Sequence, residues 1–550
     1  MNRYYARQLE ELLIAKKYEE ALRIYKFLAE KGHLEALLNI GDMYFHGMGV
    51  SQDYVEAFKH YKLAADHGLV ECMVAVGDMY RDGLGVAQDL KEAFYYYKLA
   101  SDQGNYIAQQ RLGDFYFAGA SATQDYGPAF KYYKLSADQG DLGGQYMLGN
   151  MYYSGLGVDK NLSEAIKYYK LSADQGDFRA QYMLGKMFRD GIGVDKNPSE
   201  AFKYYKLSAD QDYNNAQGAL GYMYYYGIGV AQDYNEAFKY LKLAADQNII
   251  EAQAEIGDMY YNGLGTSKDD REAFNYLKLA ADKGYAEAQY KVGTLFLRGE
   301  GVSKDYSEAL RYFSLSADQG NPIGLYMLGY LYTVGLGVDQ DFTEAFKYFK
   351  LSAEQGYNPS QMELGEMYHC GIGVLKNDKE AFKYLKLAAD KGFADAQAKV
   401  GYLFLYGEGI AKDTVEALKY LRLSVDQGNS LGQCLLGDLY REGTVVEQNY
   451  KEAFKYFELS AKQGNPLGQY VVGNMYRDGK GVSQDYSEAF KYYKLSADQG
   501  YYGAQTELGN MYYYGKGVDK NLTEAKRYFT LAAGLGDEEA KKLLDTLDFE

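Results

Sequence analysis

The chain has 550 residues, more than one hydrophobic core usually contains, and 47% of them are hydrophobic, which is ample for a packed structure. The formal net charge of −17 repels nucleic acid phosphates and anionic lipids, so no nucleic acid is expected as a partner and a neutral or basic protein is more compatible. Three scattered cysteines without a CxxC pair argue against a disulfide framework, and the lack of a signal-peptide pattern or an 18-residue apolar run predicts a cytoplasmic protein without membrane insertion.

The chain opens with a charged amphipathic helix pattern in residues 1–32, which we interpret as a capping helical half-unit. One glycine then recurs every 36 residues, fourteen times without an insertion, and so reveals an internal repeat. The recurring glycines are Gly41, Gly77, Gly113, Gly149, Gly185, Gly221, Gly257, Gly293, Gly329, Gly365, Gly401, Gly437, Gly473 and Gly509. The repeats fill residues 33–536, and residues 537–550 predict one charged capping helix.

Each repeat predicts two helices joined by a turn, as residues 33–68 illustrate. Apolar residues fall at helical spacing in the first helix, and Gly41 in its middle indicates that a second helix approaches too closely for any side chain. After the GMGV turn, Asp53 predicts an N-cap, and Glu56 three residues later predicts a capping box. The second helix has its own apolar stripe and ends at a glycine.

A single pair of such helices, each about 20 Å long, cannot bury both apolar faces, whereas stacked pairs bury a continuous core. The expected fold class is therefore all-α, a solenoid of antiparallel helix pairs with a 36-residue period. Four departures from the repeat are places where curvature is expected to change. Ser121 and Val445 replace the second turn glycine, and Asp212 and Asn248 replace the helix-ending glycine.

The repeated unit A-x-x-x-L-G-x-M-Y-x-x-G-x-G-V-x-x-D-x-x-E-A-x-K-Y-Y-x-L-x-A-D-x-G resembles the Sel-1-like repeat, a relative of the tetratricopeptide repeat with a longer period. The resemblance covers residues 33–536. It implies a right-handed α/α superhelix that acts as a non-enzymatic scaffold or adaptor in multiprotein complexes. Cysteine-rich secreted members of the family have been linked to β-lactam binding, but this chain lacks their paired cysteines.

No motif predicts catalysis, a cofactor or a metal site. The GxGV turns lack the preceding strand and the third glycine of a dinucleotide loop. Residues 159–165 lack the glycine and the distal glutamate of a calcium loop. His369 and Cys370 are adjacent, and on a helix they point about 100° apart, so they do not predict a shared metal or nucleophilic site.

The best candidate for function is the face of the first helix opposite its buried stripe, at the positions equivalent to Leu38, Asp42 and Phe45. In tetratricopeptide-like solenoids this face lines a concave groove, and the resemblance implies the same here. Tyrosines suit protein recognition because each offers a large contact area at modest entropic cost. Those predicted to bind a protein or peptide are Tyr146, Tyr153, Tyr182, Tyr222, Tyr225, Tyr261, Tyr290, Tyr326, Tyr330 and Tyr402, and the early repeats instead offer Asp42, Asp78 and Asp114.

Two alternatives remain open. A carbohydrate- or peptidoglycan-associated binding protein, or a regulator of an enzyme complex, would use the same tyrosines, and a structural spacer would use none of them. A monomer is expected, since both ends look like solubilising caps. Lysines and acids on the second helices, such as Lys62 and Asp66, predict intrahelical charge pairs on a solvated convex face.

Overall fold

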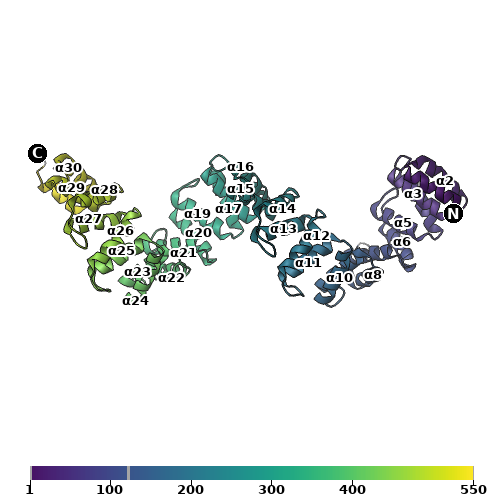
Figure 1. Cartoon of the computed structure of the whole chain (residues 1–550), viewed down its shortest axis with the longest axis horizontal. Helices are drawn as coiled ribbons and strands as arrows, with labels where there is room; N and C mark the ends of the chain where they lie inside the picture. The colour runs from purple at the N-terminus through teal and green to yellow at the C-terminus, as the bar shows by residue number, and fades with distance from the viewer. Residues whose placement is uncertain (1–2, 120–123, 549–550) are drawn as a thin grey trace. The chain divides into compact units, whose positions relative to one another are not determined.

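The computed structural model describes residues 3–119 and 124–548, in which all regular structure is α-helical. These residues separate into two compact units, Met1–Tyr276 and Leu277–Glu550 (Figure 1). The described residues form 31 helices, and helices of two kinds alternate along the chain. The first helix of each repeat is called an A helix and the second a B helix.

The helices are regular, almost all of them 13 residues long. The A helices are α3 (Leu34–His46), α5 (Val70–Asp82), α7 (Tyr106–Ala118), α9 (Leu142–Ser154), α11 (Phe178–Asp190), α13 (Asn214–Tyr226), α15 (Ile250–Asn262), α17 (Ala286–Arg298), α19 (Pro322–Val334), α21 (Asn358–Cys370), α23 (Ala394–Tyr406), α25 (Ser430–Glu442), α27 (Pro466–Asp478) and α29 (Tyr502–Tyr514). The B helices are α4 (Tyr54–Asp66), α6 (Leu90–Asp102), α8 (Tyr126–Asp138), α10 (Leu162–Asp174), α12 (Pro198–Ala209), α14 (Tyr234–Asp246), α16 (Asp270–Asp282), α18 (Tyr306–Asp318), α20 (Phe342–Glu354), α22 (Asp378–Asp390), α24 (Thr414–Asp426), α26 (Tyr450–Lys462), α28 (Tyr486–Ala497) and α30 (Leu522–Gly534).

The two ends of the chain add three helices. The segment predicted as an opening half-unit contains α1 (Arg3–Ile14) and α2 (Tyr18–Glu30), and buried residues of both helices share one cluster with α3. The closing segment contains α31 (Glu538–Thr546), which packs on α30. Among the described residues, no helix is long and apolar enough to cross a membrane.

Side-chain caps start the B helices as the sequence predicts. Asp53 Oδ1 accepts hydrogen bonds from the backbone N–H groups of Val55 and Glu56 at 2.9 and 3.1 Å. The capping box is not formed, however. The Asp53 N–H donates to the carbonyl of Tyr44 at 2.9 Å, which closes the turn, and Glu56 pairs with Lys59 at 2.6 Å. The cap is therefore one-sided, because the turn already uses the donor that a capping box would need.

The recurring A-helix glycines permit the close helix approach that the sequence predicts. A Cβ atom on Gly77 would lie 2.6 Å from the ring of Tyr97 in the following B helix, and one on Gly221 would lie 2.6 Å from Leu241. The second turn glycines serve a different contact. Gly49 has φ of +72° and lies so close to α2 that a Cβ would meet the backbone nitrogen of Glu19 at 2.6 Å.

A glutamine pair links the two helices of a repeat, and a ladder of such pairs runs along the chain. A glutamine at the end of one B helix donates to a buried glutamine of the preceding A helix, as Gln175 does to Gln145 at 2.8 Å. The same bond joins Gln139 to Gln109, Gln211 to Gln181, Gln247 to Gln217, Gln319 to Gln289, Gln427 to Gln397, Gln463 to Gln433 and Gln499 to Gln469. Since the acceptor glutamine of each pair is buried, each rung favours one packing of a B helix on its own A helix.

The departures from the repeat are absorbed in different ways. Asp212 and Asn248 adopt the left-handed conformation of the glycine they replace, with φ of 61° and 68°, which these two residue types tolerate. Val445 instead packs its side chain against a core cluster, and α25 there contacts α23 as well as its neighbours in sequence. Ser121 lies outside the described residues.

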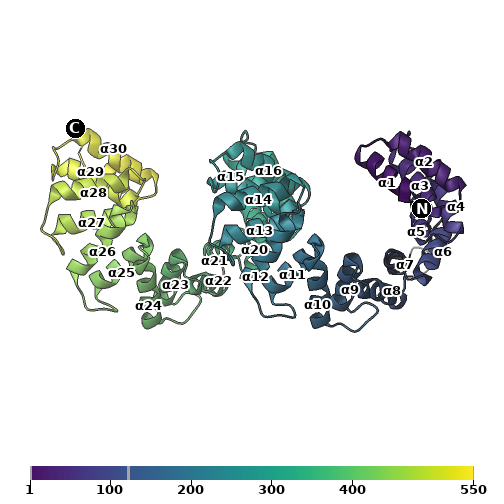
Figure 2. The same cartoon turned by 45° about the vertical axis from the view of Figure 1, so that its right-hand side comes forward.

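The A helices line the inner side of the stack. In the second unit, α17 contacts α19, α23 contacts α25, and α25 contacts α27, whereas no two described B helices of that unit approach each other to the same extent. Elements on the inside of a curved stack lie closer together than those outside, so the A helices form its concave face. Within the first unit, Figure 2 shows α3, α5 and α7 on the inner side of the arc and α4 and α6 on the outer side.

Candidate functional site

The candidate surface consists of the fifth, ninth and twelfth residues of the A helices, and is called the groove face below. All ten predicted tyrosines occupy it. Nine of them are half-buried, and Tyr330 is 39% exposed. Several also pack against core clusters: Tyr146 and Tyr153 contact one cluster, and Tyr326 contacts another. One part of such a ring therefore packs against the core, and the rest stays accessible to solvent.

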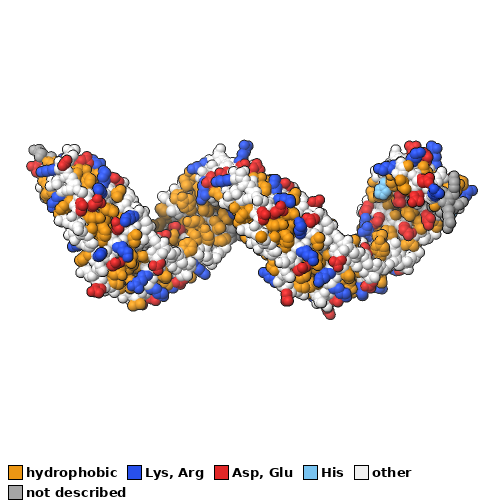
Figure 3. Space-filling model, viewed as in Figure 1, with side chains coloured by type: hydrophobic (Ala, Val, Ile, Leu, Met, Phe, Trp, Pro, Cys, Tyr) orange, Lys and Arg blue, Asp and Glu red, His pale blue; other side chains and the backbone are white. Residues whose placement is uncertain are grey.

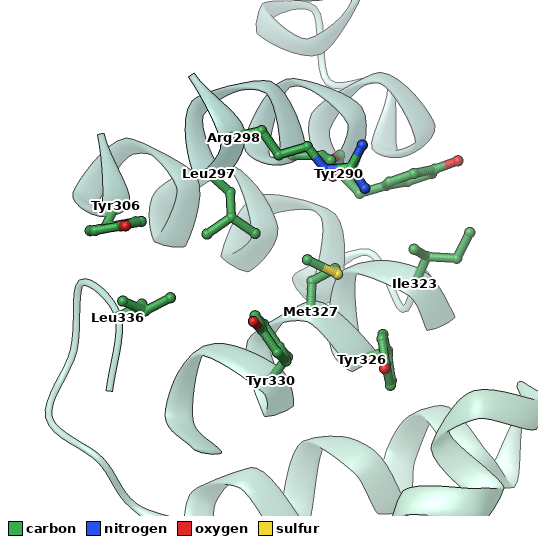
Figure 4. Close-up of a pocket in the computed structure, with 10 residues that line it drawn as sticks. Tyr290, Leu297, Arg298, Tyr306, Ile323, Tyr326, Met327, Tyr330 and Leu336 are labelled. Carbon is green, nitrogen blue, oxygen red and sulfur yellow. The ribbon is translucent and has the colours of Figure 1, made fainter. Parts of the chain in front are cut away.

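The structure brings three of the predicted tyrosines into one pocket in the second unit. Tyr290, Tyr326 and Tyr330 line a cavity of about 490 Å³. Figure 4 shows Tyr290 and Arg298 on α17, across from Tyr326, Met327 and Tyr330 on α19. The other lining residues are Thr294, Leu297, Tyr306, Ile323 and Leu336. In Figure 3, hydrophobic side chains gather in the hollow over α17 and α19.

Tyr326 is held by aromatic neighbours. Its ring contacts Phe349 and Tyr357, with centroid distances of 5.6 and 5.5 Å. Burial, aided by the negative charge of Glu363, raises the pKa of Tyr326, so its hydroxyl stays protonated and available as a donor at neutral pH. A fixed aromatic ring beside the more exposed Tyr330 is an arrangement typical of a binding anchor.

The six predicted tyrosines of the first unit line none of the pockets described. The exposed parts of these rings contact neighbouring side chains instead. The guanidinium of Arg179 lies 4.4 Å from the ring centroid of Tyr146, and Arg179 is itself held by Asp177 at 2.6 Å. Tyr182 meets the edge of Tyr213 at 5.3 Å. The remaining four are Tyr153, Tyr222, Tyr225 and Tyr261, of which Tyr225 packs against Tyr234 at 5.3 Å.

The aspartates of the early repeats help to hold the A and B helices of a repeat together. The hydroxyl of Tyr61 donates to Asp42 at 2.7 Å. The same bond joins Tyr97 to Asp78 and Tyr133 to Asp114, each at 2.7 Å. The signal was present in the sequence, because a tyrosine follows each of these aspartates after 19 residues. A role of these aspartates in recognition stays a prediction.

The B helices carry the predicted intrahelical charge pairs. Lys62 Nζ lies 2.7 Å from Asp66 Oδ2 on the same helix. Asp66 also accepts a hydrogen bond from Tyr96 of the next repeat at 3.1 Å. The pairs therefore help to join neighbouring repeats as well as to solvate the outer face.

The cysteines differ in accessibility. Cys72 and Cys434 are buried, and burial raises the pKa of their thiols to about 12 and about 11, respectively. Cys370 is exposed at the end of α21. Tyr402, the last of the ten tyrosines, lines a smaller cavity of about 200 Å³ beside His369, apart from the pocket shared by Tyr290, Tyr326 and Tyr330.

Comparison with known families decides what kind of repeat this is. Fourteen consecutive segments match the profile of the Sel1 repeat, at residues 34–69, 70–105, 107–141, 143–177, 178–213, 214–249, 250–285, 286–321, 322–357, 358–393, 394–429, 430–465, 466–501 and 503–537. The chain belongs to the Sel1 repeat family. The fold predicted from the sequence, an all-α solenoid of paired helices with a 36-residue period, is thereby confirmed. Sel1 repeat solenoids are typically protein-interaction scaffolds and are generally non-catalytic.

Solved structures of Sel1 repeat proteins include similar chains. A protective antigen of uropathogenic Escherichia coli strains that displays an SLR fold is 28% identical, with a TM-score of 0.68 over 83% of this chain and 97% of the antigen. A Sel1 repeat protein from Oxalobacter formigenes is 30% identical, covering 56% of this chain and 89% of its own, with a TM-score of 0.47. Comparison with curated proteins finds no match.

Proposed function

We propose that this Sel1 repeat chain is a non-enzymatic scaffold that binds a protein or peptide segment on the groove face of its second unit. The observation that carries the proposal is the pocket shared by Tyr290, Tyr326 and Tyr330. Family membership supports it, because protein interaction is the typical role of Sel1 repeat solenoids.

The pocket has the size and chemistry for a peptide. A volume of about 490 Å³ falls in the range of sites that enclose a small ligand or several side chains of a bound segment. Apolar side chains from two A helices and a turn form its walls, and tyrosine hydroxyls at the rim supply hydrogen bonds. Shape complementarity with aromatic anchors provides the binding energy, and no chemical step is involved.

The pocket shared by Tyr290, Tyr326 and Tyr330 is the principal anchor, and the half-buried tyrosines on other A helices extend the same surface. Stacking places equivalent positions of successive A helices side by side, so an extended segment that crosses α17 and α19 meets Tyr290 and Tyr326 in turn. The chain's net charge of −17 favours a neutral or basic segment.

Selection from a random peptide display library against the intact chain tests this proposal. The binding variant combines Tyr290→Ala, Tyr326→Ala and Tyr330→Ala. Its matched control replaces three exposed leucines on the B helices of the same unit, by Leu315→Ala, Leu351→Ala and Leu387→Ala. Circular dichroism first establishes that both variants are as helical as the parent chain.

Selected peptides should bind the parent and the B-helix control equally, and should bind the tyrosine variant at least tenfold more weakly. Peptides that bind all three proteins alike would contradict the proposal. If the library yields no binder while a glycan array does, and the tyrosine variant loses the glycan, the groove recognises carbohydrate instead.

A further inference from the structure

A polar cluster in the second unit stands apart from the pocket shared by Tyr290, Tyr326 and Tyr330. His369 near the end of α21, Asp378 at the start of α22 and Glu408 in the turn after α23 lie together. His369 Nδ1 is 2.8 Å from Asp378 Oδ1 and 3.7 Å from Glu408 Oε2. One ligand atom from each of the three residues lies within 4.8 Å of the others. All three side chains are partly buried.

The equivalent positions in another repeat are apolar. Two repeats earlier, Leu297, Tyr306 and Leu336 occupy the corresponding places. All three line the pocket that contains Tyr326 (Figure 4). In the first repeat the corresponding pair, Phe45 and Tyr54, packs edge to face at 5.1 Å. In those two repeats the contact is apolar, whereas here it consists of one imidazole and two carboxylates, which is an unfavourable exchange unless these groups share a partner.

The close stacking of repeats holds the three groups together. Gly409, next to Glu408, lies directly against the backbone of Asp378, where a Cβ atom would clash with the Asp378 carbonyl oxygen. This contact is the same one that other second turn glycines make, as between Gly337 and Tyr306. Glu408 is thus brought to Asp378 by the rigid repeat geometry and not by a flexible loop.

Tyr402 and Lys376 contact the carboxylate oxygens that face away from the histidine. Tyr402 donates its hydroxyl hydrogen bond to Glu408 Oε1 at 3.5 Å, whereas Glu408 Oε2 faces His369. Lys376 Nζ lies 3.4 Å from Asp378 Oδ2, whereas Asp378 Oδ1 faces His369. Each carboxylate is therefore oriented by one oxygen and presents the other, which is the role of outer-sphere partners in protein metal sites.

We propose that His369, Asp378 and Glu408 bind a divalent transition-metal ion such as Zn²⁺, with water completing the coordination. Imidazole nitrogen and carboxylate oxygen are ligands that Zn²⁺ prefers, at about 2.0–2.2 Å, and tetrahedral geometry then separates ligand atoms by about 3.3–3.5 Å. The observed separations of 2.8 and 3.7 Å lie on either side of that value, so small side-chain adjustments suffice.

The metal ion would join two repeats, because α21 and α22 belong to one repeat and the turn carrying Glu408 belongs to the next. The sequence predicted no metal site, since the three residues are 9 and 30 positions apart along the chain and form no local motif. Only the stacking of repeats brings them together.

Isothermal titration of the intact chain with ZnCl₂ tests the assignment. The first variant is His369→Gln. The second combines His369→Tyr, Asp378→Tyr and Glu408→Leu, which restores the residue types that other repeats carry and so preserves the fold. The control is Asp270→Tyr, which removes an acid at the position equivalent to Asp378 in a repeat that has Tyr261 in place of the histidine.

The parent chain and the control should bind one Zn²⁺ whose affinity falls at least tenfold in both site variants, and bound Zn²⁺ should raise the melting temperature of the parent and the control but not that of the site variants. Tyr402→Phe should weaken binding by up to about tenfold by releasing Glu408. Unchanged affinity and stoichiometry in His369→Gln would overturn the proposal, as would Ca²⁺ binding at the same residues as tightly as Zn²⁺.

Discussion

Replacing Tyr205 by phenylalanine should stabilise the chain, whereas the same replacement at Tyr169 should destabilise it. The two residues occupy equivalent positions in consecutive B helices, and both are fully buried. The hydroxyl of Tyr169 donates to Asn150 at 2.7 Å. The hydroxyl of Tyr205 is buried without a hydrogen-bond partner, because Lys186 stands where an acceptor is found in the neighbouring repeat.

The magnitude follows from hydrogen-bond energetics. A buried polar group without a partner costs about 1–3 kcal/mol, so Tyr205→Phe should recover about that amount. Tyr169→Phe loses a bond worth about 1 kcal/mol net and leaves the Asn150 amide without its donor. The two variants should therefore differ by about 2–4 kcal/mol in local stability, although their rings pack alike.

Hydrogen exchange followed by mass spectrometry measures the effect repeat by repeat, which suits a stack that need not unfold in one step. Exchange in α12 should slow in Tyr205→Phe, and exchange in α10 should accelerate in Tyr169→Phe. Lys186→Asn, which supplies the missing acceptor, should slow exchange with Tyr205 present but not with phenylalanine there. If both phenylalanine variants accelerate exchange equally, the hydroxyl bonds do not determine repeat stability.

Three further outcomes are expected. Gly221→Ala should destabilise α13 by about 1–3 kcal/mol because the new Cβ would lie 2.6 Å from a leucine side chain. Gly218→Ala in the same helix should instead stabilise it by up to about 1 kcal/mol, because the nearest atom to its new Cβ would be 3.7 Å away. Local hydrogen exchange distinguishes the two variants. Lys391→Gln should supply the ladder donor that the buried carbonyl oxygen of Gln361 lacks, and so raise local stability by about 1 kcal/mol; no slowing of exchange in α21 would count against the ladder. In the native chain, Cys370 should react with a thiol reagent much faster than the two buried cysteines; equal rates would mean that the repeats open readily.

The sequence was sufficient for the regular part of the fold. The 36-residue recurrence predicted the helix pairs, Asp53 predicted a real N-cap, and Gly41 predicted a real close approach, because each depends on residues within one repeat. The capping box was wrong for a tertiary reason, since the Asp53 N–H is used by the carbonyl of Tyr44. The local sequence pattern does not show whether the Asp53 N–H donates to the Glu56 side chain or to the Tyr44 carbonyl.

The candidate site was less accessible to sequence reasoning. The groove face was identified from one helix wheel, but the wheel treats Tyr146 and Tyr330 alike, although the first stacks on an arginine and the second lines an open pocket. The cluster at His369 depends on contacts between repeats. Aligning the repeats column by column would have shown that this repeat alone combines a histidine with two acids in the three columns.

Site-specific photocrosslinking of a selected peptide tests the central claim most directly, that the A helices of the second unit form the binding surface. A benzophenone amino acid is introduced at Arg298 in the pocket wall or at exposed Leu351 on a B helix. The account predicts that the peptide crosslinks at position 298 and not at 351, and that adding the uncrosslinkable peptide in excess abolishes the product. Crosslinking at 351 with none at 298 would contradict it.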